Sequence, residues 1–198
     1  LAHHDGGYST WRADLTEVME AINLLVVVVD NSANETVYPQ MADFTFYGGL
    51  YRDVNLICVP ESHFDLVYFG GPGLKITPTV DGKDATVEVE VYTTELLEGE
   101  SLVYTLYDRE ENEIAEIKST DKRVVFTLSD VHLWHGRRDP YLYTAKAELI
   151  EDGVVLDNVS ARFGCRTFEI TADRGFILNG EEYPLRGVSR HQDRWGFG

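Results

Sequence analysis

Residues 86–92 alternate strictly between two kinds of side chain. In Thr86-Val87-Glu88-Val89-Glu90-Val91-Tyr92 the valines fall on one face and the acids on the other. Because successive side chains of a β-strand point to opposite faces, this period of two predicts a strand with one face buried. The chain around it must therefore supply a second layer for the valines to pack against.

Other segments with strand-forming residues occur on both sides, at residues 102–107, 124–128, 141–149 and 161–170. Turn-forming dipeptides separate them, namely Pro72-Gly73, Asp81-Gly82, Glu98-Gly99 and Asp152-Gly153. Short strands at this spacing predict an immunoglobulin-like β-sandwich over residues 61–171. No long segment has a helical period, so the expected fold class is all-β.

Residues 1–60 are expected to form strands with one short helical interruption. The strand candidates are residues 8–13, 24–29 and 43–54. Residues 24–29 are all leucine or valine, which predicts a fully buried strand. Asp14 and Glu17 have the spacing of a capped helical turn, and Pro60 marks the end of the segment.

The aromatic stretch at residues 43–54 also contains Gly48-Gly49, which lets the backbone bend or approach another group closely. Asp43 precedes the aromatic residues and is a candidate to point at a ligand. Tyr8 and Trp11 are expected in the core, and Arg52 and Asp53 are expected to form an ion pair.

Residues 172–198 differ in character from the sandwich. Asn179-Gly180, between two short apolar or mixed segments, favours the type I′ turn of a β-hairpin. The polar run at 186–195 follows, with three arginines, a histidine, a glutamine, an aspartate and a tryptophan. These residue types bind polar ligands.

The composition excludes several kinds of partner. A net charge of −17, from 17 basic and 34 acidic residues, repels phosphate backbones and anionic membrane surfaces. Neither nucleic acid nor membrane is an expected partner. Cys58 and Cys165 belong to no zinc-binding pattern, and two reduced, buried thiols are expected, with a disulfide as the alternative.

Four stretches, taken together, resemble glycoside hydrolase family 2, and within it the bacterial β-galactosidases. They lie in order at residues 6–11, 43–54, 133–143 and 176–193. The most specific parts are Tyr47-Gly48-Gly49-Leu50-Tyr51-Arg52-Asp53-Val54 and, later, Leu185-Arg186-Gly187-Val188-Ser189-Arg190-His191. The resemblance runs over essentially the whole chain, although residues 64–130 match in pattern more than in motif.

The resemblance implies three consecutive domains. Residues 1–60 are expected to be the C-terminal part of a jelly-roll sugar-binding domain, and 61–171 the whole sandwich. Residues 172–198 are expected to begin a catalytic (β/α)₈ barrel. On this plan the chain is an internal fragment of a larger enzyme.

The resemblance also assigns site residues. Asp43 corresponds to an aspartate that binds the galactose and helps to hold a sodium ion, and His191 to a histidine that contacts a sugar hydroxyl. Arg190 is expected to pair with a carboxylate and brace the strand. The two catalytic glutamates belong to later barrel strands, so no catalytic residue is expected here, and the pairs Asn34-Glu35 and Asn112-Glu113 are rejected as the acid/base motif.

The expected function is therefore that of a fragment of a retaining β-galactosidase that hydrolyses terminal β-D-galactosides, inactive by itself. The full-length enzyme is expected to be a bacterial, cytoplasmic homo-oligomer, with sodium and magnesium as its cofactors. Two alternatives stay open. One is a related glycosidase such as a β-glucuronidase, and the other is a non-catalytic sandwich module for carbohydrate binding or adhesion.

Overall fold

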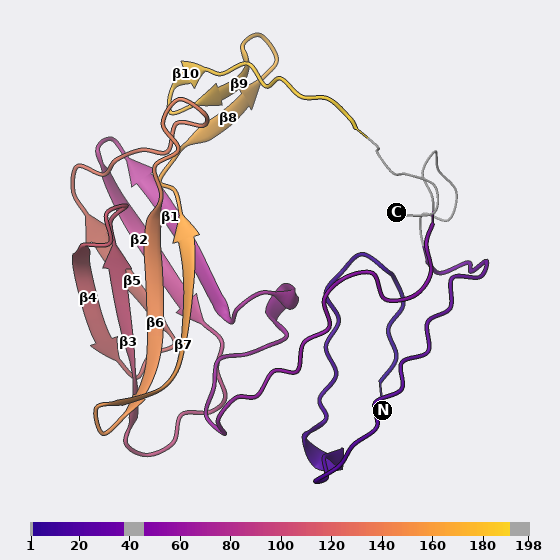
Figure 1. Ribbon diagram of the computed structural model, residues 1–198. Coiled ribbons are helices and arrows are strands. Elements are labelled where there is room, and N and C mark those ends of the chain that lie inside the picture. The colour runs from indigo at the N-terminus through magenta and orange to yellow at the C-terminus, as the bar shows by residue number, and fades with distance from the viewer. Residues whose placement is uncertain (1, 38–45, 191–198) are drawn as a thin grey trace. The chain divides into compact units, whose positions relative to one another are not determined.

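The computed structural model describes residues 2–37 and 46–190 (Figure 1). The chain divides into two compact units, Leu1–Ile57 with Gly187–Gly198, and Cys58–Arg186.

Seven antiparallel strands of the second unit form the two sheets of a β-sandwich. The first sheet has the order β1-β2-β5, with β1 at Leu74–Asp81, β2 at Asp84–Val91 and β5 at Arg123–Leu128. The second has the order β4-β3-β6-β7, with β3 at Glu100–Tyr107, β4 at Glu113–Ser119, β6 at Tyr143–Glu151 and β7 at Val154–Phe163. This is the predicted immunoglobulin-like sandwich.

The core lies between the inward faces of these sheets. Val87, Val89 and Val91 of β2 are buried, while Glu90 between them reaches the outer face. The facing strands contribute further fully buried side chains, among them Leu102, Tyr104, Leu106, Ala145, Ala147 and Leu149. The alternation at 86–92 therefore predicted the buried face correctly.

Asp152 and Gly153 form the tight turn between β6 and β7. Asp152 and Gly153 both have positive φ, 47° and 81°, as a type I′ turn requires. With this turn Glu151 pairs with Val154, and a β-bulge between Leu149 and Ile150 then shifts the register by one residue, so that Leu149 pairs with Asp157. The predicted turn at Asp152-Gly153 is confirmed.

Two strands have no counterpart in the sequence-based prediction, β1 and β4. Both lie at the edge of their sheet. Edge strands often carry proline and charged side chains, which disfavour pairing with other chains. Pro78 interrupts the pattern of β1, and β4 has few apolar residues, so neither has a strong strand signal.

The strand predicted at 161–170 covers only the end of β7, which begins at Val154, and most of β8. β7 ends at Phe163, and β8 at Phe168–Thr171 belongs to a third sheet, with β9 at Gly175–Leu178 and β10 at Glu181–Glu182. Its order is β10-β9-β8, and it lies beyond one end of the sandwich in Figure 1. Gly164 marks the break, since a Cβ there would lie 2.8 Å from the Trp134 Cβ.

The hairpin predicted around Asn179-Gly180 is confirmed. Asn179 has φ 50° and Gly180 has φ 81°, and Leu178 pairs with Glu181 across the turn. β8 in turn pairs with β9, so this sheet crosses the expected domain boundary between residues 171 and 172.

In the first unit, the expected helical turn is present as the 3₁₀ helix η1 at Thr16–Val18, where Asp14 Oδ1 accepts a hydrogen bond from the Thr16 N–H. The expected strands are not formed: the described residues of this unit contain no strand. Leu24 and Val28 are each 89% exposed, and Tyr8 and Trp11 are also exposed. An apolar run becomes a buried strand only when neighbouring strands and a facing layer cover it, and the described residues supply neither.

Both cysteines are free, Cys58 exposed and Cys165 buried. The expectation of reduced thiols is confirmed, and that of burial is wrong for Cys58. Burial raises the pKa of the Cys165 thiol to about 11.

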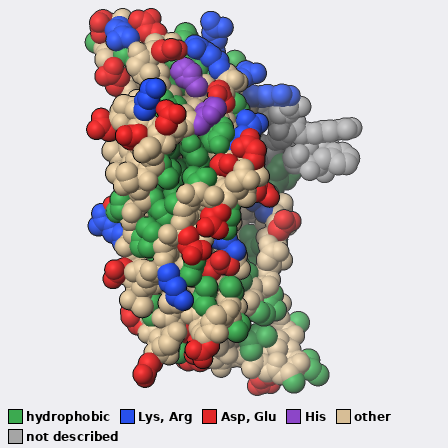
Figure 2. Space-filling model, turned by 90° about the vertical axis from the view of Figure 1, so that its left-hand side faces the viewer, with side chains coloured by type: hydrophobic (Ala, Val, Ile, Leu, Met, Phe, Trp, Pro, Cys, Tyr) green, Lys and Arg blue, Asp and Glu red, His purple; other side chains and the backbone are tan. Residues whose placement is uncertain are grey.

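Acidic side chains are spread over the face of the molecule shown in Figure 2. Within the described ranges, no helix is long and apolar enough to cross a membrane.

Tyr104 offers a test of the sandwich core. Its ring is fully buried, and its hydroxyl donates a 2.7 Å hydrogen bond to the Asp121 carbonyl. Tyr104→Phe leaves this carbonyl without its donor and is expected to lower the free energy of unfolding by about 1–2 kcal/mol at pH 7, measured by urea denaturation. Tyr107→Phe, at a half-buried site, is the control and should change it by less than about 0.5 kcal/mol.

Burial also raises the pKa of Tyr104 above its usual range. The neutral phenol stabilises the folded state fully below pH 10, the ordinary tyrosine pKa, and this stabilisation is lost as the pH rises further. The difference between wild type and Tyr104→Phe should therefore shrink above pH 10. A constant difference would contradict this assignment.

Candidate functional site

The two residues predicted to bind substrate, Asp43 and His191, lie outside the described residues. Arg190, next to His191, is described, and it makes an interaction of its own. The structure does describe the segments that lead to both residues, at 46–54 and 175–190.

The double glycine after Asp43 lets the chain pass close to Asn31. A Cβ at Gly48 would lie 3.0 Å from the Asn31 Cγ, and Gly49 has φ 81°, which favours glycine. The Asn31 amide donates a 3.5 Å hydrogen bond to the Phe46 carbonyl. The close approach expected from the sequence is therefore present.

The same segment is tied to the start of the chain. Tyr51 Oη donates to the Gly7 carbonyl at 3.0 Å, and Arg52 Nη1 to the Tyr8 carbonyl at 3.5 Å. The Arg52 guanidinium also lies 5.5 Å from the centre of the Tyr51 ring. The guanidinium is thus directed at the Tyr8 backbone, and the expected ion pair with Asp53 is not among those of the described residues.

The hairpin ahead of His191 is held by the side chain of Asn179. Its Oδ1 accepts a hydrogen bond from the Thr167 N–H at 2.9 Å, and its Nδ2 donates to the Trp134 carbonyl at 3.0 Å. The Trp134 N–H in turn donates to the Cys165 carbonyl at 2.8 Å. One amide therefore joins the hairpin, residues 164–167 and the loop at 132–142. We call this junction the seam.

A second set of contacts closes the seam at its outer end. Glu181 Oε2 accepts from His135 Nε2 at 3.3 Å and from Arg138 Nη1 at 3.1 Å. The Tyr183 hydroxyl accepts from the Arg137 N–H at 3.1 Å. Gly136, with φ 61°, lies so close to Tyr183 that a Cβ would meet its hydroxyl at 2.3 Å.

The loop is also braced within itself. His132 Nε2 lies 2.6 Å from Asp139 Oδ2, and the imidazole stacks on the Tyr141 ring with centroids 4.0 Å apart. On its other side, Arg166 lies 4.8 Å from the Trp134 ring centre. The polar groups of the seam thus contact one another and brace the hairpin against the loop at 132–142.

The rejected Asn112-Glu113 pair has a structural role in the turn between β3 and β4. Asp108 accepts hydrogen bonds from the Asn112 backbone and side-chain N–H groups, each 2.8 Å long. The side-chain hydrogen bond from Asn112 is the main cause that lowers the pKa of Asp108. Glu113 begins β4 and is exposed.

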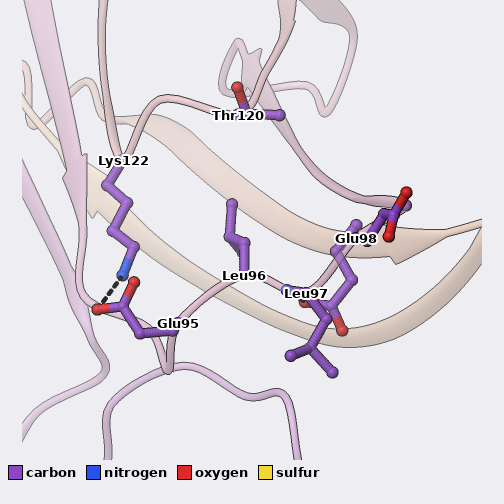
Figure 3. A pocket seen from close by; sticks show the side chains of 8 residues that line it. Glu95, Leu96, Leu97, Glu98, Thr120 and Lys122 are labelled. Carbon is purple, nitrogen blue, oxygen red and sulfur yellow. Dashed lines mark hydrogen bonds and ion pairs between the residues drawn. The ribbon is translucent and has the colours of Figure 1, made fainter.

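A hollow of about 420 Å³ lies beside the β2–β3 loop. Figure 3 shows the side chains that line it. Glu95, Leu96, Leu97, Glu98, Thr120 and Lys122 line it. Lys122 Nζ donates to the carbonyls of Thr93 and Thr94 at 3.3 and 3.2 Å, and lies 4.0 Å from Glu95. The buried Glu100 accepts from the Leu97 N–H at 2.8 Å. These contacts hold the β2–β3 loop in place beside the hollow.

Sequence reasoning missed the seam. The sequence predicts only a turn at Asn179 and indicates no role for His132, His135 or Arg138. The signal available was two histidines and two arginines within seven residues of an otherwise acidic chain. Among the described residues, no group of three or more histidine, cysteine, aspartate or glutamate side chains is placed to hold a metal ion.

The family model for glycosyl hydrolases family 2 matches residues 72–166. A β-glucuronidase of Bacteroides fragilis is 28% identical over 214 residues, covering 98% of this chain and 30% of that protein. A β-galactosidase of Thermoanaerobacter pseudethanolicus is 31% identical over 206 residues, covering 97% of this chain and 26% of that protein.

Solved structures of glycosidases are also similar to this chain. The FMN-binding β-glucuronidase from Facaelibacterium prausnitzii L2-6 is 42% identical with a TM-score of 0.77, covering 82% of this chain and 26% of that one. Bacteroides uniformis β-glucuronidase 2, covalently bound to cyclophellitol-6-carboxylate aziridine, is 31% identical with a TM-score of 0.73, covering 86% and 22%. The chain thus spans less than a third of the length of each of these relatives.

Asn179 offers a test of the seam. Asn179→Gly keeps the left-handed turn but removes both side-chain hydrogen bonds, which should destabilise the seam by about 1–3 kcal/mol. Amide hydrogen exchange of the segment containing Thr167 should therefore become about tenfold faster or more. Asp152→Gly is the matched control, since Asp152 has the equivalent turn position with φ 47°. If both variants leave the exchange of this segment unchanged, the bridging role of Asn179 is wrong.

Proposed function

Because the chain belongs to glycoside hydrolase family 2, we propose that the full-length protein is a retaining glycosidase that hydrolyses terminal β-glycosides. The observation that carries this proposal is the match of the family model to residues 72–166, which contain β1–β7. The glycosidases of Bacteroides fragilis and Thermoanaerobacter pseudethanolicus match it over 98% and 97% of this chain, well beyond the sandwich.

A retaining glycosidase needs two carboxyl groups about 5 Å apart, one as nucleophile and one as acid/base. We place both in a barrel that follows this chain, at the carboxyl ends of its strands. The covalent complex of the Bacteroides uniformis relative supports a nucleophile of this kind. The present chain by itself is then inactive and supplies sugar contacts.

We propose Asp43 and His191 as those contacts. A carboxylate at position 43 accepts hydrogen bonds from sugar hydroxyls and is a ligand that a sodium ion prefers. His191 contacts a sugar hydroxyl and favours the transition state. In this proposal the double glycine and the Tyr51 and Arg52 contacts hold the segment that follows Asp43, while the seam holds the hairpin ahead of His191. Sodium, as well as magnesium elsewhere in the full-length enzyme, remains a prediction.

Two substrates are favoured by specific observations. The 42% identity to a β-glucuronidase favours a β-D-glucuronide. The 31% identity to a β-galactosidase, together with the Tyr-Gly-Gly-Leu-Tyr-Arg-Asp motif, favours a β-D-galactoside. We propose the glucuronide as the main substrate. The β-glucuronidase has the higher sequence identity to this chain, and the two enzymes match comparable parts of it.

The substrate proposal is tested with purified full-length protein on p-nitrophenyl β-D-glucuronide and β-D-galactoside. We expect the glucuronide to have the higher kcat/KM and the first product, followed by NMR, to be the β-anomer. The 198-residue chain alone should give no turnover above buffer. A preference for the galactoside would reverse the assignment, and hydrolysis of neither would overturn the glycosidase proposal.

The site residues are tested by Asp43→Ala and His191→Ala in the full-length protein. Loss of a hydrogen bond to a charged group removes about 1.5–3 kcal/mol, so each variant should lose about 10- to 100-fold in kcat/KM. We expect Asp43→Ala to act mainly on KM and His191→Ala mainly on kcat. Asp53→Asn is the control and should retain wild-type kinetics. Wild-type activity of Asp43→Ala and His191→Ala would show that neither residue contributes to the site.

A further inference from the structure

One loop of the sandwich, residues 67–73, is held firmly against the end of β2. The Tyr68 ring stacks on the Tyr92 ring with centroids 4.2 Å apart and planes at 17°. The Tyr92 N–H donates to the Gly73 carbonyl at 2.9 Å, and the Asp65 N–H donates to the Tyr92 carbonyl at 2.8 Å. A Cβ at Gly73 would meet the Tyr92 carbonyl at 2.5 Å, so the loop packs too closely there for any residue but glycine.

This well-held loop presents Phe69 to solvent. The Phe69 side chain is 95% exposed, and its backbone has φ 43° and ψ 31°. A left-handed backbone is unfavourable for a bulky residue, and an exposed phenyl ring is unfavourable in water. Two unfavourable features at one residue are typical of a position that is used for binding.

Polar groups continue the surface next to the rings. Tyr92 Oη donates a 2.9 Å hydrogen bond to Glu90 Oε1, and Lys75 Nζ lies 3.1 Å from Glu90 Oε2. The hydrogen bond from Tyr92 is the main cause that lowers the pKa of Glu90, so its carboxylate stays charged. The Lys75 and Glu90 side chains are 46% and 30% exposed. We call Tyr68, Phe69, Lys75, Glu90 and Tyr92 the aromatic strip.

We propose that the aromatic strip is an accessory binding surface for a neutral polysaccharide. One face of a pyranose ring carries mainly C–H groups and can bury apolar area against the Phe69 ring. Its hydroxyls can donate to the Glu90 carboxylate and accept from the Lys75 ammonium, which remain accessible beside the rings. The strip thus combines an apolar platform with hydrogen-bonding groups at its border.

The negative charge of the chain favours an uncharged polysaccharide over an acidic one. With a net charge of −17, these 198 residues disfavour a polysaccharide with a carboxylate on every repeat, whose many charges add up, far more than a glycoside with a single carboxylate. Lys75 is engaged by Glu90, and Arg123 of the neighbouring strand by Glu88, so neither is a free cation for such a polymer. A protein partner is less well suited, because one protruding phenyl ring among paired charges offers little contiguous apolar area.

The test is affinity electrophoresis of the full-length protein in gels that contain β-1,4-galactan, xyloglucan, glucomannan or, as the acidic polymer, hyaluronan. Phe69→Gly removes the ring and relieves the left-handed backbone, so it should fold at least as well as wild type. Phe168→Ala removes another exposed phenyl ring, 63% exposed, on β8 and is the matched control.

We expect at least one neutral polysaccharide to retard the wild type and Phe168→Ala, and Phe69→Gly to bind it about tenfold more weakly. Turnover of a p-nitrophenyl glycoside should be equal in the wild type and Phe69→Gly, and thermal unfolding should show that all three proteins are folded. Retardation by none of the neutral polymers, by hyaluronan alone, or equally for Phe69→Gly would overturn the proposal. So would self-association that depends on Phe69 in the absence of polysaccharide binding. The electrophoresis measures binding and does not require catalysis. A full-length protein without glycosidase activity would therefore still show whether the aromatic strip binds polysaccharide.

Discussion

The burial of one face each of β2, β3 and β6 is the constraint on which the described structure depends. Each strand places its apolar side chains into the space between the sheets, and the centre of this layer is fully buried. Burying such a side chain stabilises the fold by about 1.5–3 kcal/mol, but only while the opposite sheet is present. The loop of the aromatic strip and the seam are attached to this frame through Tyr92 and Cys165, so both depend on it for their geometry.

The sequence predicted the fold where one local signal decided the outcome. The alternation around Val89 and the dipeptides at 152–153 and 179–180 each specify a strand face or a turn by their own stereochemistry. Edge strands β1 and β4 were missed because their side chains face solvent on one side and are selected for solubility. The run at 24–29 was misjudged because its apolar character is local, whereas burial depends on which other segments are present.

For the site, the sequence could indicate candidate residues but not their surroundings. The resemblance pointed to Asp43 and His191, and the structure describes only the segments beside them. Several of the contacts that support these segments join residues more than 40 positions apart, such as Asn179 with Trp134 and Tyr51 with Gly7. A single sequence carries no local pattern for such pairs. Taken alone, Asn179 is typical of a turn and Tyr51 of a strand, so neither residue indicates its distant partner.

The pairing of β8 with β9 has a practical consequence for anyone who exchanges domains between relatives. A chimera joined between residues 171 and 172, where the motifs suggest a boundary, would combine strands from two parents in one three-stranded sheet. It would also set the Asn179 amide of one parent against the Trp134 carbonyl of the other. The natural module for transfer is therefore the sandwich with its whole hairpin, and a crossover placed after Tyr183 keeps every one of these partners from the same parent.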